Sequence, residues 1–330
     1  MEGKSQGSTD LSSDIDSQNI TCFYFPTSFS SQKVLLALYE KNVQFKPKLV
    51  SLFHGQHMEP WYVRLNPDGV HVPVLKDGTK IINNPEEIID YIDMMSDTGP
   101  TLVPDLKTSL GQSVASVREQ LTSIPVDVIT YGIIFHPHLS ASGCRLPFAV
   151  QRSMRENFAK RLCYLSHKAT RHPSLRDGYL AKSQTAAQKY DIITDEEKVK
   201  GQLDQLDKIF TDIEILLRKT KEGSEDGGEL WLFGKMITAA DISLTILLSR
   251  LSLLGMEARY FPAKTCPNIH KYYQLFQKRP TFRRIQYEIN DLRWTLVVED
   301  LKAAAPYMLG AAGVLVAAGL VVWLVKTIHK

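Results

Sequence analysis

The stretch that most constrains the fold is an apolar strand with an internal proline, followed by a hairpin and a helix. It reads "HVPVLKDGTKIINNPEEIIDYI" and covers residues 71–92, with Pro73 inside the first strand. Asp77 and Gly78 form a hairpin signal between two short runs of β-forming residues. An Asn-Pro pair then gives a typical helix start. We therefore expect two short strands and a helix over 85–95.

The residues before this stretch add a strand, a helix and a second strand. "ITCFYF", residues 20–25, is an apolar β-rich run. "SSQKVLLALYEK" follows with apolar residues at helical spacing, and Ser30 or Ser31 is the expected N-cap. "VQFKPKLV" is a strand at a sheet edge, because Pro47 cannot donate to a β-ladder. This order predicts a thioredoxin-like α/β domain over 20–96.

Beyond residue 97 the strand signals fade and helical patterns take over. Thr194 and Glu197 open one long pattern with a capping box. That pattern carries a single apolar stripe, which is either the core face of a helical domain or, over barely three heptads, a dimer seam. A second capping box, Thr238 with Asp241, opens a helix that is apolar nearly all round. We therefore expect an all-α domain over 97–300. The stripe consists of Val199, Leu203, Leu206, Phe210, Ile213 and Leu217.

A polar, basic segment of about 145–193 interrupts the helical domain and shows only a patchy helical pattern. The net charge of the whole chain is +3, and no basic run is interleaved with aromatic residues. Nucleic acid is therefore not an expected partner.

Residues 1–19 are polar and serine-rich and predict a disordered leader. The cysteines form no CxxC pair, which indicates a reducing, cytosol-facing protein; they are Cys22, Cys144, Cys163 and Cys266.

The C-terminal residues predict a membrane anchor over 301–330. Eighteen residues without charge, "MLGAAGVLVAAGLVVWLV", run from Met308 to Val325, and only "KTIHK" follows. This length approaches what an α-helix needs to cross the hydrocarbon core, so we expect a transmembrane helix over about 306–325. A buried core helix is the alternative. A short, glycine-rich span favours the mitochondrial outer membrane, while the peroxisome and the endoplasmic reticulum stay open.

Several motifs resemble the glutathione S-transferase superfamily. "NPDGVHVPVL" is similar to its Asn-Pro-x-Gly-x-Val-Pro-x-Leu element, and "LFGKMITAADISL" to its helix-capping motif. "SFSSQKV", "EPWYVRLN", "SIPVDVITYGIIFHPHLS" and "GYLAK" resemble one branch, the ganglioside-induced differentiation-associated protein 1 family. The resemblance implies a glutathione S-transferase fold with a tail anchor in the mitochondrial outer membrane, and often in peroxisomes. It also implies a role in mitochondrial fission and links to redox balance.

The resemblance also implies where a transferase site would lie. Ser28 matches the position of the catalytic serine, at the start of the first helix, where the helix dipole favours a thiolate. The alternative is that the serines here only cap the helix. Pro73 is implied to be cis, so that the backbone of Val72 pairs with the cysteinyl part of glutathione.

The carboxylate-binding half of that site departs from the superfamily pattern. The serine that ordinarily binds the γ-glutamyl carboxylate is replaced by Pro85, which has neither a hydroxyl nor an N–H group. Asn84 precedes it as an expected N-cap and as the remaining candidate contact to glutathione. Glu86 and Glu87 place two negative charges in the first turn, where we expect them to repel an incoming carboxylate. Glutathione is therefore the only candidate cofactor, and its binding stays open.

Other site chemistry is weaker. His54/His57 and His136/His138 have spacings that a metal ion could use, but no thiolate or carboxylate clusters with them in the sequence, so no metal is expected.

Three functions compete. The first is a tail-anchored regulator of mitochondrial fission with little or no transferase activity. The second is an active transferase that uses Ser28. The third is an adaptor whose basic insertion binds tubulin or anionic lipid. A homodimer and the fission machinery are further candidate partners.

Overall fold

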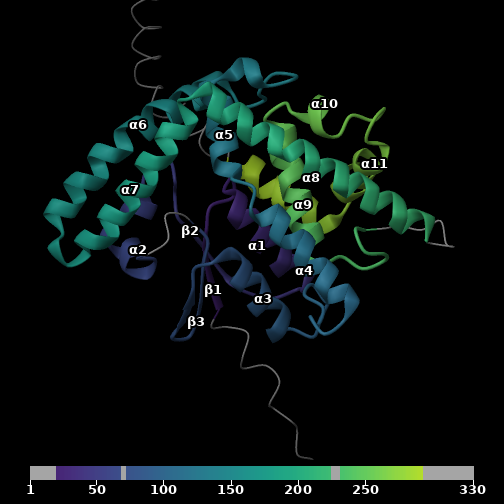
Figure 1. Cartoon of the computed structure of the whole chain (residues 1–330). Coiled ribbons are helices and arrows are strands. Elements are labelled where there is room, and N and C mark those ends of the chain that lie inside the picture. The colour runs from purple at the N-terminus through teal and green to yellow at the C-terminus, as the bar shows by residue number, and fades with distance from the viewer. Residues whose placement is uncertain (1–19, 68–71, 224–230, 293–330) are drawn as a thin grey trace, which may run out of the picture. The chain divides into compact units, whose positions relative to one another are not determined.

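The computed structural model describes residues 20–67, 72–223 and 231–292. The chain divides into two compact units, residues 1–283 and residues 284–330. The first unit contains the sheet and helices α1 to α11 (Figure 1). Its N-terminal part is a sheet flanked by helices and the remainder is helical. This arrangement confirms the predicted combination of a thioredoxin-like α/β domain and an all-α domain.

Four strands form the sheet, in the order β2-β1-β3-β4. β1 pairs in parallel with β2 and antiparallel with β3, which pairs antiparallel with β4. Cys22 lies opposite Leu75, and Leu75 lies opposite Ile82. β2 is an edge strand, as Pro47 predicts. The strands are β1 (Ile20–Tyr24), β2 (Lys46–Leu49), β3 (Val74–Asp77) and β4 (Lys80–Ile82).

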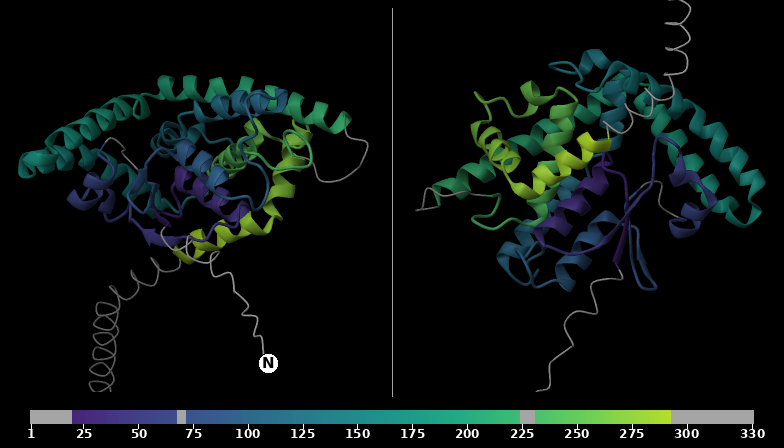
Figure 2. Two further views of the ribbon diagram at one scale, coloured as in Figure 1. Left: turned by 90° about the horizontal axis from the view of Figure 1, so that it is seen from below. Right: turned by 180° about the vertical axis from the view of Figure 1, so that it is seen from behind.

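Helices α1 and α3 lie on one side of the sheet and α2 lies on the other (Figures 1 and 2). The helix predicted over 85–95 is confirmed as α3. The predicted N-cap of α1 is wrong, because the capping residue is Ser28, whose Oγ accepts from the Ser31 amide at 3.4 Å. Ser28 still has an extended backbone, whereas Ser30 and Ser31 are already helical. The bounds are α1 (Phe29–Glu40), η1 (Gln56–Met58), α2 (Pro60–Leu65) and α3 (Pro85–Met95).

The all-α part is built around α9, which packs against both α1 and α4. Most of α9 is buried, as its apolar sequence predicts. The stripe on α8 is buried at all six positions, which confirms the core-face interpretation. A further helix runs over 280–292. The other bounds are α4 (Ser109–Thr122), α5 (Val126–Phe135), η2 (Pro137–Leu139), α8 (Glu196–Glu222), α9 (Ala239–Leu253), α10 (Glu257–Tyr260) and α11 (Pro267–Gln277).

One of the two predicted capping boxes is confirmed. Thr238 and Asp241 cap α9 reciprocally, and the Asp241 carboxylate also accepts the Leu232 amide at 2.8 Å. The box predicted at Thr194 is wrong by one residue. Asp195 is the N-cap of α8, whereas the Thr194 hydroxyl donates back to the Tyr190 carbonyl oxygen at the end of the preceding helix. Because α8 follows α7 without a loop, Thr194 is the C-cap of α7 and the next residue caps α8.

The insertion over about 145–193 is more regular than its patchy pattern predicts. It consists of α6 (Phe148–Arg171), η3 (Pro173–Leu175) and α7 (Arg176–Ile193), and α6 packs along α7 (Figure 1). Only Phe158, Leu165 and Ala169 of α6 are buried. Because so few positions of a 24-residue helix face a core, its apolar periodicity is weak although the helix is long.

The predicted leader, residues 1–19, and the predicted anchor, residues 301–330, lie outside the described residues. Within 20–67, 72–223 and 231–292, every helix is too short or too polar to cross a lipid bilayer.

Candidate functional site

Ser28 stands where β1 turns into α1. Its amide donates to the Phe25 carbonyl oxygen at 2.9 Å, and this hydrogen bond closes the turn. Its hydroxyl donates to the Val72 carbonyl oxygen at 3.3 Å and accepts from the Ser31 amide at 3.4 Å. The hydroxyl is thus already engaged as both donor and acceptor. A thiol that used Ser28 as its hydrogen-bond donor would compete with Val72.

Val72 and Pro73 lie directly before β3, and the peptide bond between them is cis, as the resemblance implies. Val72 is buried, with 1% of its surface exposed. The fold brings Val72 next to Ser28 across 44 residues of sequence. These two predicted site residues therefore share one location. The carbonyl oxygen of Val72 faces the serine hydroxyl.

Asn84 and Pro85 begin α3 as the sequence predicts. The Asn84 side-chain oxygen accepts from the amides of Glu86 at 2.9 Å and Glu87 at 3.4 Å. Pro85 occupies the first turn, where its missing N–H group costs nothing. Free amides at a helix N-terminus are what a bound carboxylate requires. Here the Asn84 side chain already occupies two of them.

The expected repulsion from the first turn of α3 is wrong for Glu86. Its carboxylate pairs with Lys33 of α1, and Arg118 Nε of α4 lies 2.7 Å from its second oxygen. Burial by itself would raise the pKa of Glu86, but Lys33 and Arg118 outweigh burial and hold that pKa below its usual value. Burial conversely lowers the pKa of Lys33. The negative charge of Glu86 is balanced internally, so that Glu87 is the exposed acid of this turn.

Arg250 connects the helical domain to the turn that carries Ser28. It lies on α9, and its Nη2 donates to the Thr27 carbonyl oxygen at 2.8 Å. Burial lowers the pKa of Arg250 to about 10. No carboxylate pairs with it among the described residues. Sequence reasoning missed this contact, because its two partners are 223 residues apart and neither belongs to a motif.

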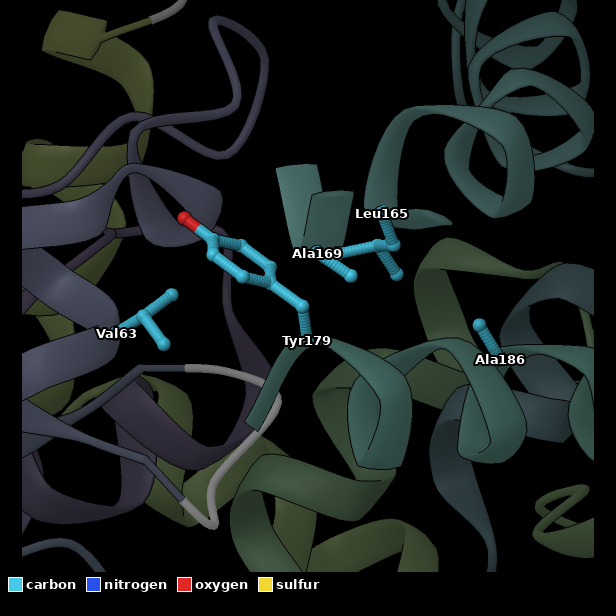
Figure 3. Close-up of a cluster of buried hydrophobic side chains, with 5 residues drawn as sticks. All are labelled: Val63, Leu165, Ala169, Tyr179 and Ala186. Atoms are coloured by element: carbon cyan, nitrogen blue, oxygen red, sulfur yellow. The ribbon is translucent and has the colours of Figure 1, made fainter. Parts of the chain in front are cut away.

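The α6–α7 hairpin is fastened to η1 and α2 of the first domain. Tyr179 Oη donates to the Met58 carbonyl oxygen at 3.0 Å, and Lys168 Nζ lies 3.0 Å from a Glu59 carboxylate oxygen. Val63 contributes the α2 side of a small apolar cluster (Figure 3). The insertion therefore bridges both domains, which its polar sequence did not indicate. The other members of the cluster are Leu165, Ala169, Tyr179 and Ala186.

The histidines and cysteines are placed as follows. His138 Nε2 lies 3.1 Å from Glu196, and His136 Nε2 lies 3.1 Å from the Ile193 carbonyl oxygen. Across the described ranges no three His, Cys, Asp or Glu side chains are grouped as a metal ion would require. None of the four cysteines is in a disulfide, and Cys163 is the exposed one.

The polar groups around Ser28 and the start of α3 satisfy one another. The Ser28 hydroxyl donates its hydrogen bond to the Val72 carbonyl oxygen. The Asn84 side chain accepts from the Glu86 amide at the start of α3. Lys33 and Arg118 pair with Glu86 in the first turn of α3. A tripeptide would therefore have to replace internal hydrogen bonds rather than fill open ones, which reduces its net gain in free energy.

Comparisons with known proteins agree with this fold. Residues 27–95 match the family "Glutathione S-transferase, N-terminal domain", and residues 170–284 match "Glutathione S-transferase, C-terminal domain". The solved structure of beta-etherase LigF from Sphingobium sp. strain SYK-6 is similar at a TM-score of 0.58 and 16% identity, covering 82% of this chain and 99% of that one. Glutathione S-transferase TCHQD of Arabidopsis thaliana is 24% identical, over 80% of this chain and 88% of its own.

A narrower relationship is also present. Human ganglioside-induced differentiation-associated protein 1-like 1 is 31% identical over 305 residues, which cover 89% of this chain and 82% of the relative. The mouse protein of the same name is 31% identical over 308 residues. The matched region includes both domains. The chain therefore belongs to the ganglioside-induced differentiation-associated protein 1 family and has the glutathione S-transferase fold.

Proposed function

We propose that this protein is a tail-anchored regulator of mitochondrial fission and network shape, with a role in redox balance and little or no glutathione transferase activity. Its transferase-like body would face the cytosol from the mitochondrial outer membrane, with a peroxisomal share. The uncharged run over 308–325 supports the anchor. The body would act by recruiting partners rather than by catalysis.

One observation carries the low-activity part of the proposal. The Ser28 hydroxyl and the Val72 carbonyl oxygen bind each other at 3.3 Å, although a ligand thiol and a ligand amide would need both. The Asn84 side chain likewise occupies the amides that a ligand carboxylate would need. Each of these contacts offsets part of the free energy that glutathione binding would supply.

The experiment is a calorimetric titration of the full chain with glutathione, together with a thiol-conjugation assay. We expect no saturable heat at glutathione concentrations up to about 1 mM, which corresponds to a binding free energy weaker than about −4 kcal/mol. A micromolar dissociation constant would contradict the proposal. Ser30→Ala is the matched control for handling of the protein, because Ser30 makes no side-chain hydrogen bond among the described residues.

The anchor is tested separately by deleting residues 306–330. The shortened chain should leave the organelle for the cytosol and lose any effect on mitochondrial length. A deletion variant that still changes mitochondrial length from the cytosol would contradict the anchored mode of action. Targeting the body to another membrane with an unrelated span tests whether the outer membrane itself is required.

An active transferase that uses Ser28 is the second candidate function. It is favoured by the placement of Ser28 at the N-terminus of α1 beside the cis Val72–Pro73 bond. This function predicts retention on immobilised glutathione and loss of turnover in Ser28→Ala, with turnover kept in Ser30→Ala. Absence of both retention and turnover in the unmodified chain removes this candidate.

A further inference from the structure

One side of α6 is exposed along the whole helix and is basic. Phe148, Arg152, Lys160 and Arg171 lie on it, spaced by whole helical turns, and all four are exposed. Cys163 and His167 lie on the same side and are also exposed. Glu156 is the acidic residue on this side. We call these seven residues the α6 stripe.

Two cations of the α6 stripe are not neutralised within the described part of the chain. Lys160 and Arg171 form no ion pair with any described residue, and Arg152 pairs with Glu156 at 2.8 Å. The surrounding segment 145–193 holds ten basic and three acidic residues, a net charge of +7, whereas the whole chain carries +3. The remainder of the chain is therefore net acidic. Arg145, Lys168 and Lys189 of the segment pair with Glu257, Glu59 and Asp127 outside it, which offsets three of these seven net charges. The remaining excess of positive charge still lies on this segment.

An exposed aromatic ring stands at the start of the α6 stripe. Phe148 leaves 71% of its surface exposed. An exposed phenylalanine beside basic side chains suits a membrane surface, where an aromatic ring can enter the interface and cations can meet anionic head groups. An acidic protein would account for the cations but would leave the ring without a function.

The hairpin presents this side rigidly. The opposite side of α6 is held down by Leu165 and Ala169, which pack on Tyr179 of α7 and Val63 of α2 (Figure 3). Lys168 fixes the same helix to Glu59. The α6 stripe therefore cannot rotate into the core. It runs along the 24 residues of α6 as a continuous exposed surface.

We propose that the α6 stripe binds the surface of an anionic phospholipid bilayer. Lys160, Arg171 and Arg152 would meet phosphate and carboxylate head groups, and Phe148 would enter the interface. This inference rests on the proposed function in one respect, because a C-terminal anchor would keep the body close to a bilayer. The binding itself uses only residues of the hairpin.

The test uses the full chain assembled in neutral phosphatidylcholine nanodiscs, so that the predicted span is occupied. An environment-sensitive dye is placed on Cys163 in a Cys144→Ser/Cys266→Ser background, in which Cys22 stays buried. Vesicles with phosphatidylserine should shift the dye emission to the blue, and pure phosphatidylcholine vesicles should not. Raising the salt from about 0.1 M to about 0.5 M should reverse the shift, because screening weakens contacts between exposed charges.

Charge reversal identifies the residues. Lys160→Glu/Arg171→Glu should weaken the apparent lipid affinity by about 25-fold or more, since each basic residue near an anionic surface contributes roughly fivefold. The matched control Lys208→Glu/Lys271→Glu makes the same change of net charge at exposed positions of α8 and α11, outside the hairpin. This control should change the apparent lipid affinity by less than about twofold. Phe148→Ala should weaken binding more than Leu180→Ala.

Several outcomes would overturn the inference. They are no blue shift with anionic vesicles, an equal shift with neutral vesicles, or unchanged affinity after the Lys160/Arg171 reversal. Tighter binding of polyglutamate than of anionic vesicles would assign the α6 stripe to an acidic protein instead. A chain that fails to enter nanodiscs contradicts the proposed anchor, and the anionic vesicles can still be titrated against that chain in detergent-free buffer.

Discussion

The Ser28 hydroxyl donates a hydrogen bond to the carbonyl oxygen of Val72 at 3.3 Å. This contact joins the start of α1 to the loop before β3, and it links the two residues that a glutathione-binding site would need most. The same hydroxyl accepts from the Ser31 amide. Ser28 is consequently a structural residue in this fold, whatever chemistry it also performs. Substitutions at and around Ser28 can separate these two roles.

Replacing Ser28 by alanine should lower the free energy of unfolding by about 1 kcal/mol, because α1 loses its N-cap. Glutathione conjugation should stay at its background rate. Urea unfolding and a spectrophotometric conjugation assay measure the two effects. Ser30→Ala should change stability by less than about 0.5 kcal/mol. A Ser28→Ala chain with unchanged stability and lost conjugation would instead make Ser28 a catalytic residue.

Replacing Pro85 by serine should not restore glutathione binding by itself. The new hydroxyl and N–H group would stand beside Asn84, whose side chain still holds the amides of Glu86 and Glu87. Asn84→Gly/Pro85→Ser frees those amides at a cost of only a few tenths of a kcal/mol in capping. Calorimetry should show heat for the double variant and none for either single variant. Tight binding by Pro85→Ser alone would contradict this account.

Replacing Glu86 by glutamine should destabilise the protein by about 2 kcal/mol at neutral pH, since Lys33 and Arg118 lose their buried partner. The pKa of Glu86 is lowered in the folded state from the usual 4.5. Its contribution is therefore fully present above 4.5 and is lost as the pH falls through the folded pKa.

The difference between Glu86→Gln and the unmodified chain should thus shrink below pH 4.5, measured by urea unfolding at several pH values. Glu87→Gln is the control, because Glu87 is exposed and forms no ion pair with any described residue. A difference that stays constant down to pH 2 would show that the ion pairs do not supply the stability.

Replacing Tyr179 by phenylalanine should loosen the attachment of the hairpin to α2. The ring stays in its cluster, but the Met58 carbonyl oxygen loses the hydroxyl that donates to it at 3.0 Å. We expect a loss of about 1 kcal/mol and faster amide exchange in α2 and α7. Tyr190→Phe is the control, since the Tyr190 hydroxyl makes no hydrogen bond within the described part of the chain. Equal exchange in both variants would contradict the fastening role.

The sequence predicts the local features of the fold well. The hairpin between β3 and β4, the start of α3 and the buried stripe of α8 all depend on residues within a few positions of each other. Asp241 belongs to the same group, because a capping box is complete within four residues. The misplaced caps of α1 and α8 are errors of one to three residues, at helix ends where several hydroxyl or carboxylate side chains follow one another.

The features that the sequence does not predict depend on distant partners. Glu86 is 53 residues from Lys33 and 32 from Arg118, so its local context shows only an acidic first turn. The hairpin is similar, because Tyr179 and Met58 are 121 residues apart. The small apolar cluster beneath the hairpin contains residues from both domains. Neither contributing segment has enough apolar residues to predict this cluster from its sequence pattern.

The attachment of α6 and α7 to α2 limits how the two halves of this chain can be recombined. A chimera that takes residues 20–96 from a transferase without the hairpin would leave Tyr179 and Leu165 facing water, since Val63 would be missing beneath them. Conversely, a first domain expressed alone would expose Val63. Substitutions on α2 must therefore be matched by substitutions in 165–186.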